Sequence, residues 1–180
     1  MAGQPGARAT SIGRVLPESA RLRFRQMTAG DLDDMAALLG DPEVMAYYPA
    51  PKSRAEAGQW IDWNLGLYRS YGYGLWVVRL AESGEFVGDC GLTPQVVDGR
   101  EELEVGYHVM RPLQGRGYAT EAAAAARDFA RDRLGARRLT AIIHPANLAS
   151  QRVAEKIGLR PEKRTRSAAG ADIVLYAANW

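Results

Sequence analysis

Two glycines with one residue between them stand where a strand-like stretch gives way to a helix-like one, and this spacing could bind an anion. The strand-like stretch, Leu103–Met110, alternates and is rich in Val and Tyr. A tight turn, Gln114-Gly-Arg-Gly, follows it, and from Tyr118 onward alanines recur at helical spacing. A glycine turn leading into a helix aims several backbone N–H groups and the positive end of the helix dipole at one point. The sequence therefore predicts that a phosphate can approach the backbone at Gly115 and Gly117.

Neither common nucleotide fingerprint fits this turn. A dinucleotide-binding turn needs a third Gly or Ala where Thr120 stands, and the Gly-Lys-Ser/Thr of a P-loop is absent. On spacing alone, a plain strand-to-helix turn followed by alanines with high helix propensity is an open alternative.

The segment Gln114-Gly-Arg-Gly-Tyr-Ala119 resembles the Q/R-x-x-G-x-G/A signature of the GNAT acyl-CoA N-acyltransferase superfamily. The resemblance implies that the loop amides hold the pyrophosphate of acetyl-CoA and that the preceding strand pairs with the pantetheine arm. It makes one group of residues the expected cofactor site: Gln114, Gly115, Arg116, Gly117, Tyr118 and Ala119 in the loop, and Val109 and Met110 in the strand, whose backbone would stabilise the thioester oxygen.

By the same resemblance, Glu104 faces the acceptor cleft and removes the proton of the amine, often through water. Burial of Glu104 in a cleft among aromatic side chains would raise its pKa toward a useful range. The alternative is that Glu104 is one of two exposed carboxylates, with Glu102 on the same strand face. The resemblance also implies that this strand parts from the next strand, which begins at Arg138, and so opens a slot for pantetheine.

Asn147 and Ser150 open a later helix, where both residue types are favoured as caps. The resemblance gives Asn147 a contact with the cofactor arm or an ordered water, and Ser150 a contact with the departing sulfur as donor or acid. Four basic residues are candidates for the cofactor phosphates, with a solvated surface position as the alternative for each: Arg111, Arg116, Arg152 and Lys156.

Cys90 is the only cysteine and could in principle form an acyl-enzyme. It lies inside an apolar strand pattern with no basic neighbour in sequence, so we interpret it as a small buried strand residue. Direct attack by the amine needs no such nucleophile. Transfer then requires a base, stabilisation of the carbonyl oxygen and a proton for the thiolate.

The elements that must position these residues follow from periodicity and turn signals. Strands are predicted at residues 21–27, 73–80, 85–92, 103–110, 138–144, 161–166 and 173–177, with a hairpin loop at 96–100. Helices are predicted at 31–39, 41–47, 53–68, from 118 onward and at 147–157. The order indicates an α+β domain of the GNAT fold, with a central, mixed, mostly antiparallel twisted sheet flanked by helices. Residues 1–18 read as a flexible tail and 19–180 as one domain.

Aromatic residues gather in the helical excursion after the first strand, a region that walls the acceptor site in this fold. The group comprises Tyr47, Tyr48, Trp60, Trp63 and Tyr71. Trp60 and Trp63 stand at helical spacing, so we expect them in the core rather than in the pocket.

Composition sets the remaining bounds. With 180 residues, 47% hydrophobic and 24% charged, the chain resembles an ordinary globular domain. A net charge of +2 without a basic stripe gives no indication of nucleic-acid binding. One cysteine and two distant histidines predict no disulfide and no metal site, and no apolar run reaches the length of a membrane helix. We expect a cytoplasmic monomer or homodimer.

Segments along nearly the whole chain after residue 18 resemble the Rim-type branch, which acetylates the N-termini of ribosomal proteins; they include Asp41-Pro-Glu-Val-Met and Asn147-Leu-Ala-Ser-Gln-Arg. The expected function is acetyl-CoA-dependent transfer of an acetyl group to a primary amine, foremost a protein N-terminal amine. A small amine or antibiotic as acceptor, and a non-catalytic acyl-CoA-binding module, are the alternatives.

Overall fold

The computed structural model describes residues 16–167 and 169–180. It contains seven strands: β1 Leu22–Arg25, β2 Leu75–Leu80, β3 Phe86–Val97, β4 Arg100–Val109, β5 Arg138–Ile143, β6 Arg160–Arg166 and β7 Asp172–Asn179. The helices are α1 Leu32–Leu39, α2 Arg54–Tyr71, α3 Tyr118–Asp132 and α4 Leu148–Lys156, with short 3-10 turns η1 Ala29–Asp31 and η2 Arg111–Leu113. The predicted α+β class is confirmed.

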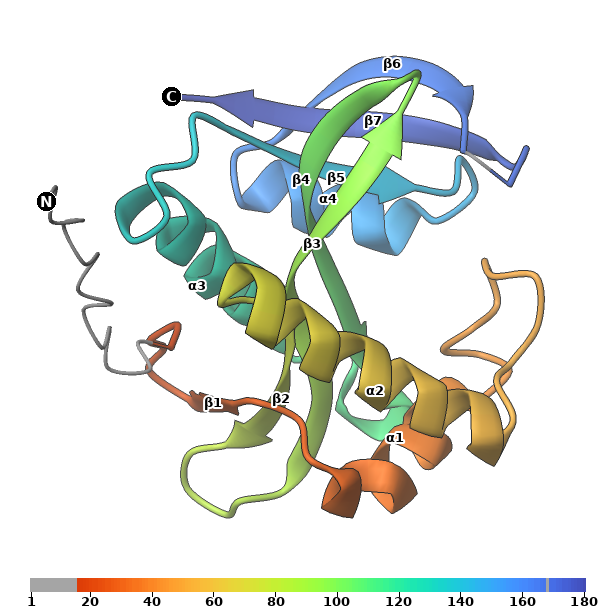
Figure 1. The fold of residues 1–180 in the computed structure, drawn as a ribbon, viewed down its shortest axis with the longest axis vertical. Coiled ribbons are helices and arrows are strands. Elements are labelled where there is room, and N and C mark those ends of the chain that lie inside the picture. Colours follow the sequence, from red (N-terminus) through yellow and green to blue (C-terminus); the bar gives the residue numbers. More distant parts are fainter. Residues whose placement is uncertain (1–15, 168) are drawn as a thin grey trace, which may run out of the picture.

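The strands form one sheet in the order β1-β2-β3-β4-β5-β7-β6. Neighbours pair antiparallel throughout the sheet except for the parallel pair β4 and β5 in its middle. In Figure 1, α2 crosses in front of the long β3–β4 hairpin, while β5, β7 and β6 lie beyond it at the opposite end from β1 and β2. One large buried cluster contains residues from every strand except β6 and from all four α-helices.

Local signals place the helix starts where the sequence predicts them. Thr28 and Asp31 form a reciprocal capping box, and Ser53 and Glu56 form another at the start of α2. In α3, one face is buried at Ala122, Ala123, Ala126, Phe129 and Ala130, as the helical spacing of the alanines predicts.

The predicted helix at 41–47 is wrong, because the chain forms consecutive turns there. The Asp41 carboxylate accepts hydrogen bonds from the backbone N–H groups of Glu43, at 2.8 Å, and Val44, at 3.3 Å. Pro49 and Pro51 follow closely, so the chain has no room to extend a helix beyond its first turn. The turns leave the 40–53 segment standing beside α2 (Figure 1).

The hairpin between β3 and β4 is tighter and its strands are longer than predicted. Both central residues of the turn have positive φ, 51° at Asp98 and 75° at Gly99, as in the type I′ turns that match strand twist. The Asp98 carboxylate also accepts from the Lys163 ammonium at 2.6 Å and from the Thr165 hydroxyl at 2.7 Å. The hairpin tip is thereby tied to β6.

Most of the predicted tail, residues 1–15 of 1–18, lies outside the described residues. Leu16 packs against the main core and Pro17 is buried. The packed part of the domain therefore includes at least these two residues of the segment predicted as tail.

Candidate active site

The glycine turn leaves the start of α3 open. Gly115 and Gly117 both adopt left-handed backbone, with φ of 75° and 83°. A Cβ at Gly115 would meet nothing within 4 Å, and one at Gly117 would meet only the Arg21 guanidinium at 3.5 Å. Gly117 is the N-cap of α3, and within the described chain no side chain caps that end. The first amides of α3 therefore face open space at the positive end of the helix dipole.

Arg21 is the basic residue that the structure brings to this turn, and it was not predicted from the sequence. Its guanidinium donates to the Arg116 carbonyl at 3.3 Å and lies 4.7 Å from the centre of the Tyr118 ring. An ion pair with Glu121, at 2.6 Å, holds it there. Arg21 directly precedes β1 and lies 95 residues before Arg116, so no local pattern points to it.

The basic residues proposed from sequence do not gather at one point. Arg111 turns toward the 41–43 turn, where its guanidinium lies 2.6 Å from the Glu43 carboxylate. Arg116, Arg152 and Lys156 are exposed. Arg116 lies in the glycine turn itself and remains the sequence candidate nearest to it.

Strands β4 and β5 part as the resemblance implies. Their one register pair in the described chain joins Glu104 to Thr140. Beyond it, the backbone N–H of Ile142 points to the Glu104 carboxylate, at 3.4 Å, instead of to a β4 carbonyl. Parallel strands normally share evenly spaced ladder bonds, so a slot opens from this pair onward.

At the far end of β4, the two strand residues expected to serve the thioester are not equivalent. The Met110 amide donates to the Val87 carbonyl at 2.8 Å and is already used by the fold. The Gln114 side-chain amide donates to the Val109 carbonyl at 3.0 Å, so Gln114 fixes the end of the strand. Val109 remains the proposed position for the stabilising amide.

Glu104 lies at the mouth of the slot, in a cavity of about 720 Å³. Its carboxylate accepts from the Thr93 hydroxyl at 3.1 Å as well as from Ile142. Burial raises the pKa of Glu104 from 4.5 to about 7, and the hydrogen bonds offset only part of this effect. At neutral pH this carboxyl can therefore both accept and release a proton.

The alternative of two exposed carboxylates on β4 is wrong. Glu102 is 6% exposed and its carboxylate pairs with the Arg138 guanidinium at 2.8 Å. Arg138 also pairs with Glu162 at 2.8 Å, so the three form a structural bridge across β4, β5 and β6. Glu104, only partly buried, is left as the carboxylate that faces the cavity.

The start of α4 closes one side of the same cavity. The Asn147 side chain accepts from the Ser150 backbone N–H at 3.1 Å and is the helix cap. The Tyr107 hydroxyl donates to the Ser150 carbonyl at 2.9 Å and so fixes β4 to α4. Because Asn147 performs the capping, the Ser150 hydroxyl is not needed for it. All three residues line the cavity.

The aromatic residues divide differently from the expectation. Trp63, 39% exposed, lines the cavity, so its assignment to the core is wrong. Trp60 packs against the main core as expected and also lines the cavity. The helix α2 is amphipathic with an interior apolar face at Ala57, Ile61 and Leu67, which turns the two tryptophans toward the cavity. Their rings pack with centroids 5.1 Å apart. Tyr47 and Tyr48 line the cavity as predicted.

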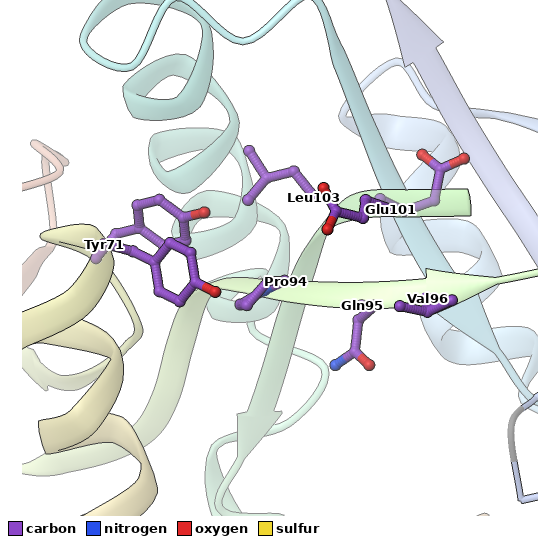
Figure 2. A pocket seen from close by; sticks show the side chains of 8 residues that line it. Tyr71, Pro94, Gln95, Val96, Glu101 and Leu103 are labelled. Atoms are coloured by element: carbon purple, nitrogen blue, oxygen red, sulfur yellow. The ribbon is translucent and has the colours of Figure 1, made fainter. Parts of the chain in front are cut away.

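Tyr71 belongs to a different hollow. It lies at the end of α2 beside Tyr73, with ring centroids 5.6 Å apart. Figure 2 shows it opposite Pro94 of β3 and Leu103 of β4, while Gln95 points to the other side of the strand. Tyr71 is therefore not part of the wall that contains Glu104.

A buried polar chain beside Glu104 was also missed from sequence. Asp89 is 1% exposed and accepts from the Trp60 indole N–H at 3.0 Å. Its other carboxylate oxygen lies 2.7 Å from Nδ1 of His108, and Nε2 of His108 lies 2.8 Å from the Tyr48 hydroxyl. An Asp inside the apolar stretch Phe86–Leu92 was the one signal available, since such residues are rarely buried without partners.

Cys90 is buried as expected, and burial raises the pKa of its thiol. A thiol held protonated is a poor nucleophile. Within residues 16–167 and 169–180, no group of three or more metal-ligating side chains gathers, and no helix is long and apolar enough to cross a bilayer.

Comparison with known proteins agrees with this geometry. A family model described as an acetyltransferase (GNAT) domain matches residues 21–160. The Bacillus subtilis protein YkkB is 39% identical over 147 residues, covering 81% of this chain and 86% of its own. The uncharacterized N-acetyltransferase YoaA of the same organism is 26% identical over 147 residues, covering 81% of this chain and 82% of its own.

Solved structures share the fold at lower identity. An acetyltransferase from Agrobacterium tumefaciens superposes with a TM-score of 0.80 at 23% identity, covering 99% of this chain and 100% of that one. RimL, a ribosomal L7/L12 alpha-N-protein acetyltransferase in complex with coenzyme A, gives 0.73 at 19%, covering 91% and 96%. The aminoglycoside acetyltransferase AAC(6')-Ib in complex with coenzyme A gives 0.73 at 17%, covering 88% and 94%.

Proposed function

Since the chain belongs to the GNAT acetyltransferase family, an acetyl-CoA-dependent group of enzymes, we propose that it acetylates the free α-amine of a peptide or protein by direct transfer. The observation that carries this proposal is the position of Glu104. Its carboxyl lies in the cavity where β4 and β5 part, with a pKa of about 7. An α-amine, with a pKa of about 7.7–8.0, is well matched to such a base.

On the cofactor side, we assign the pyrophosphate to the amides at the start of α3, above Gly115 and Gly117. Gln114, Arg116, Tyr118 and Ala119 complete this loop, and Arg21 adds a cation beside it. The pantetheine arm is assigned to the slot between Val109 and β5. Its amide groups would use the backbone positions that the missing β4–β5 ladder leaves unpaired.

On the chemical side, Glu104 accepts a proton from the amine, and the nitrogen attacks the thioester carbon. The C–N bond forms and the C–S bond breaks as the tetrahedral intermediate collapses. Ser150 is the proposed donor to the departing sulfur, with Asn147 holding the cofactor arm or an ordered water beside it. This route uses neither a metal nor Cys90.

The choice of a protein N-terminal amine rests on the segments that resemble the Rim-type branch, 41–45 and 147–159. The cavity lining includes Tyr47 and Tyr48, which closely follow the first of these segments, and Asn147 and Ser150 from the second. The domain at residues 19–180 would act as one unit, and a single cysteine suits a reducing compartment such as the cytoplasm. A small amine is the second candidate, since the aromatic wall at Trp60 and Trp63 would also suit a compact apolar amine.

The test is release of free thiol from acetyl-CoA in the presence of defined amines. The panel contains short peptides that begin with Ala, Ser or Met, the same peptides with blocked N-termini, and tyramine, spermidine and kanamycin. Turnover with the free peptides and none with the blocked ones would support the proposal. Turnover confined to a small amine would replace the acceptor class, and no turnover with any amine would overturn the assignment of acceptors altogether.

A further inference from the structure

The chain Asp89–His108–Tyr48 is a hydrogen-bonded path that ends in the acceptor cavity. It joins three parts of the fold: Asp89 on β3, His108 on β4 and Tyr48 in the turns after α1. Asp89 and His108 are 1% and 7% exposed, whereas Tyr48 is 46% exposed and lines the cavity. A buried Asp–His pair is costly to desolvate, so its retention beneath a cavity wall requires an explanation.

The partners of Asp89 determine where the protons are. The Trp60 indole can only donate, so one Asp89 oxygen accepts from it at 3.0 Å. The other oxygen, 2.7 Å from Nδ1 of His108, accepts from that nitrogen. A neutral His108 therefore has its proton on Nδ1 and a lone pair on Nε2, and the Tyr48 hydroxyl donates to Nε2 at 2.8 Å.

The Tyr48 oxygen is thereby left with its acceptor side turned to the cavity. Burial of the Tyr48 hydroxyl, and then the nearby charges of Glu104 and Asp89, raise the pKa of Tyr48. A phenol with a raised pKa does not ionise near neutral pH, but its oxygen can still accept a hydrogen bond while its own proton moves inward. The acidic groups near the Tyr48 hydroxyl are Asp89 on β3 and Glu104 on β4. The basic group is Lys52, whose ammonium lies 5.3 Å from the centre of the Trp60 ring.

We propose that Tyr48 contacts the acceptor nitrogen as a second proton-accepting group, and that His108 and Asp89 are positioning residues which receive the proton behind it. This inference rests on the acetyl transfer proposed above. In that reaction an ammonium loses two protons in becoming an amide nitrogen. Glu104 takes the first before attack. The second passes to the Tyr48 oxygen as the Tyr48 proton passes to Nε2 of His108, and the resulting imidazolium is paired with Asp89.

The proton balance then closes without another reactant. Two protons leave the nitrogen, one is matched by the proton that the departing thiolate acquires, and one is released to solvent. The C–N bond forms from the nitrogen lone pair, and the C–S bonding pair leaves with the sulfur. Two accepting groups in one cavity let both protons leave the nitrogen without Glu104 having to discharge the first in between.

The proton positions can be tested without any acceptor. His144 is the other histidine in the sequence, and its Nδ1 accepts from the Ala146 backbone N–H at 3.1 Å, so a neutral His144 carries its proton on Nε2. Ring ¹⁵N NMR of the wild type, recorded at a pH where both ring signals are those of the neutral form, should show opposite tautomers for the two histidines. Asp89→Asn should shift the Nδ1–H signal of His108 and leave the Nε2–H signal of His144 unchanged. Two Nε2–H histidines in the wild type would overturn the inference.

The functional arm uses Tyr48→Phe, with Tyr71→Phe as the matched control because Tyr71 lies in the separate hollow of Figure 2. Turnover is measured with whichever Ala, Ser or Met peptide, or tyramine, is used fastest. General acid–base groups contribute about 10²–10⁴-fold, so Tyr48→Phe should lower kcat at least about tenfold. The KM for acetyl-CoA should stay within about twofold, and Tyr71→Phe should match the wild type.

A double variant tests whether Tyr48 and Asp89 act together or independently. If Tyr48 and Asp89 act in one path, Tyr48→Phe with Asp89→Asn should lose little more than either change alone. Multiplicative losses, or a kcat for folded Tyr48→Phe within twofold of wild type, would overturn the inference. Absence of wild-type turnover with every amine would instead refute the proposed acceptors, while the NMR arm would still decide the proton positions.

Discussion

Replacing Glu104 with Gln tests the proposed base most directly, because the side chain keeps its size and loses its titration. The wild-type carboxyl, with a pKa of about 7, is ionised in about a tenth of molecules at pH 6 and nine tenths at pH 8. We expect kcat/KM for the wild type to rise with an apparent pKa near 7. In Glu104→Gln this limb should move to the pKa of the amine itself, about 7.7–8.0 for an α-amine.

The size of the loss should depend on pH in a defined way. A general base contributes about 10²–10⁴-fold, or roughly 3–5 kcal/mol of barrier. Below pH 7 both enzymes follow the same slope, so the loss in kcat/KM stays constant. Above pH 7 the wild-type rate has levelled off while that of the variant still rises to the amine pKa, so the loss should shrink about five- to tenfold between pH 7 and 8 and then stay constant. The assay is thiol release from acetyl-CoA between pH 6 and 10.

Stability gives an independent readout of the same group. The folded-state pKa of this acid is raised above its ordinary 4.5, so the native protein binds more protons than the unfolded chain between pH 4.5 and about 7. Its contribution to stability is full below 4.5 and is lost as the pH rises through this window. The upper limit is about 3.5 kcal/mol at about 1.4 kcal/mol per pH unit. Glu104→Gln should therefore gain stability relative to wild type as the pH rises.

Glu102→Gln is the matched control, since Glu102 lies on the same strand but pairs with Arg138 rather than facing the cavity. It should lower the melting temperature and leave the pH profile of kcat/KM unchanged. The reasoning fails if Glu104→Gln loses the same factor at every pH, or if its acid limb stays near 7.

Coenzyme A at 100 times its Kd should stabilise the fold by about 2.7 kcal/mol. For a chain of this size, that corresponds to a rise in melting temperature of roughly 5–10 °C. No shift at millimolar coenzyme A would contradict the proposed cofactor site. Gly117→Asp should abolish that temperature shift, because it places a negative charge where the pyrophosphate is assigned. Gly135→Asp is the control and should keep the temperature shift, since Gly135 is also left-handed and a Cβ there would meet nothing within 4 Å. Equal coenzyme A affinity in both variants would make the loop a plain turn. Ser150→Ala should slow thiol release without loss of stability, because Asn147 provides the helix cap. A lower melting temperature with normal turnover in Ser150→Ala would remove the role proposed for Ser150. Asn147→Ala should lower the free energy of unfolding by about 0.5–2 kcal/mol.

Features written in neighbouring residues were predictable from the sequence. Thr28 and Ser53 start helices through bonds to residues three positions on, and the glycine turn and α3 follow each other directly. Alternation along β4 placed Glu104 on a definite face. The parting of β4 from β5 came only from the family resemblance, since pairing depends on two segments 36 residues apart.

What the sequence could not give was long-range burial. Whether Glu102 is exposed depends on Arg138, and whether Trp60 lies in the core depends on the indole donating to Asp89. The bond between His108 and Tyr48 spans 60 residues and the one between Arg21 and Arg116 spans 95. Helical spacing alone treats the two tryptophans as equivalent core residues, and it carries no information on which neighbour each will meet.

The parting of β4 and β5 has a consequence for the folded state at rest. At its centre, the described sheet is joined by one register pair, Glu104–Thr140, with the Glu102–Arg138 ion pair beside it. The sheet therefore consists of two half-sheets in partial contact. Local opening in proteins begins where few backbone bonds must break, so the β5–β7–β6 half is the unit expected to loosen first. A pantetheine arm bound in the gap as proposed would hydrogen-bond to the unpaired backbone of β4 and β5, as an additional strand would. The supply of acyl-CoA would then set how long the enzyme stays folded as well as how fast it works.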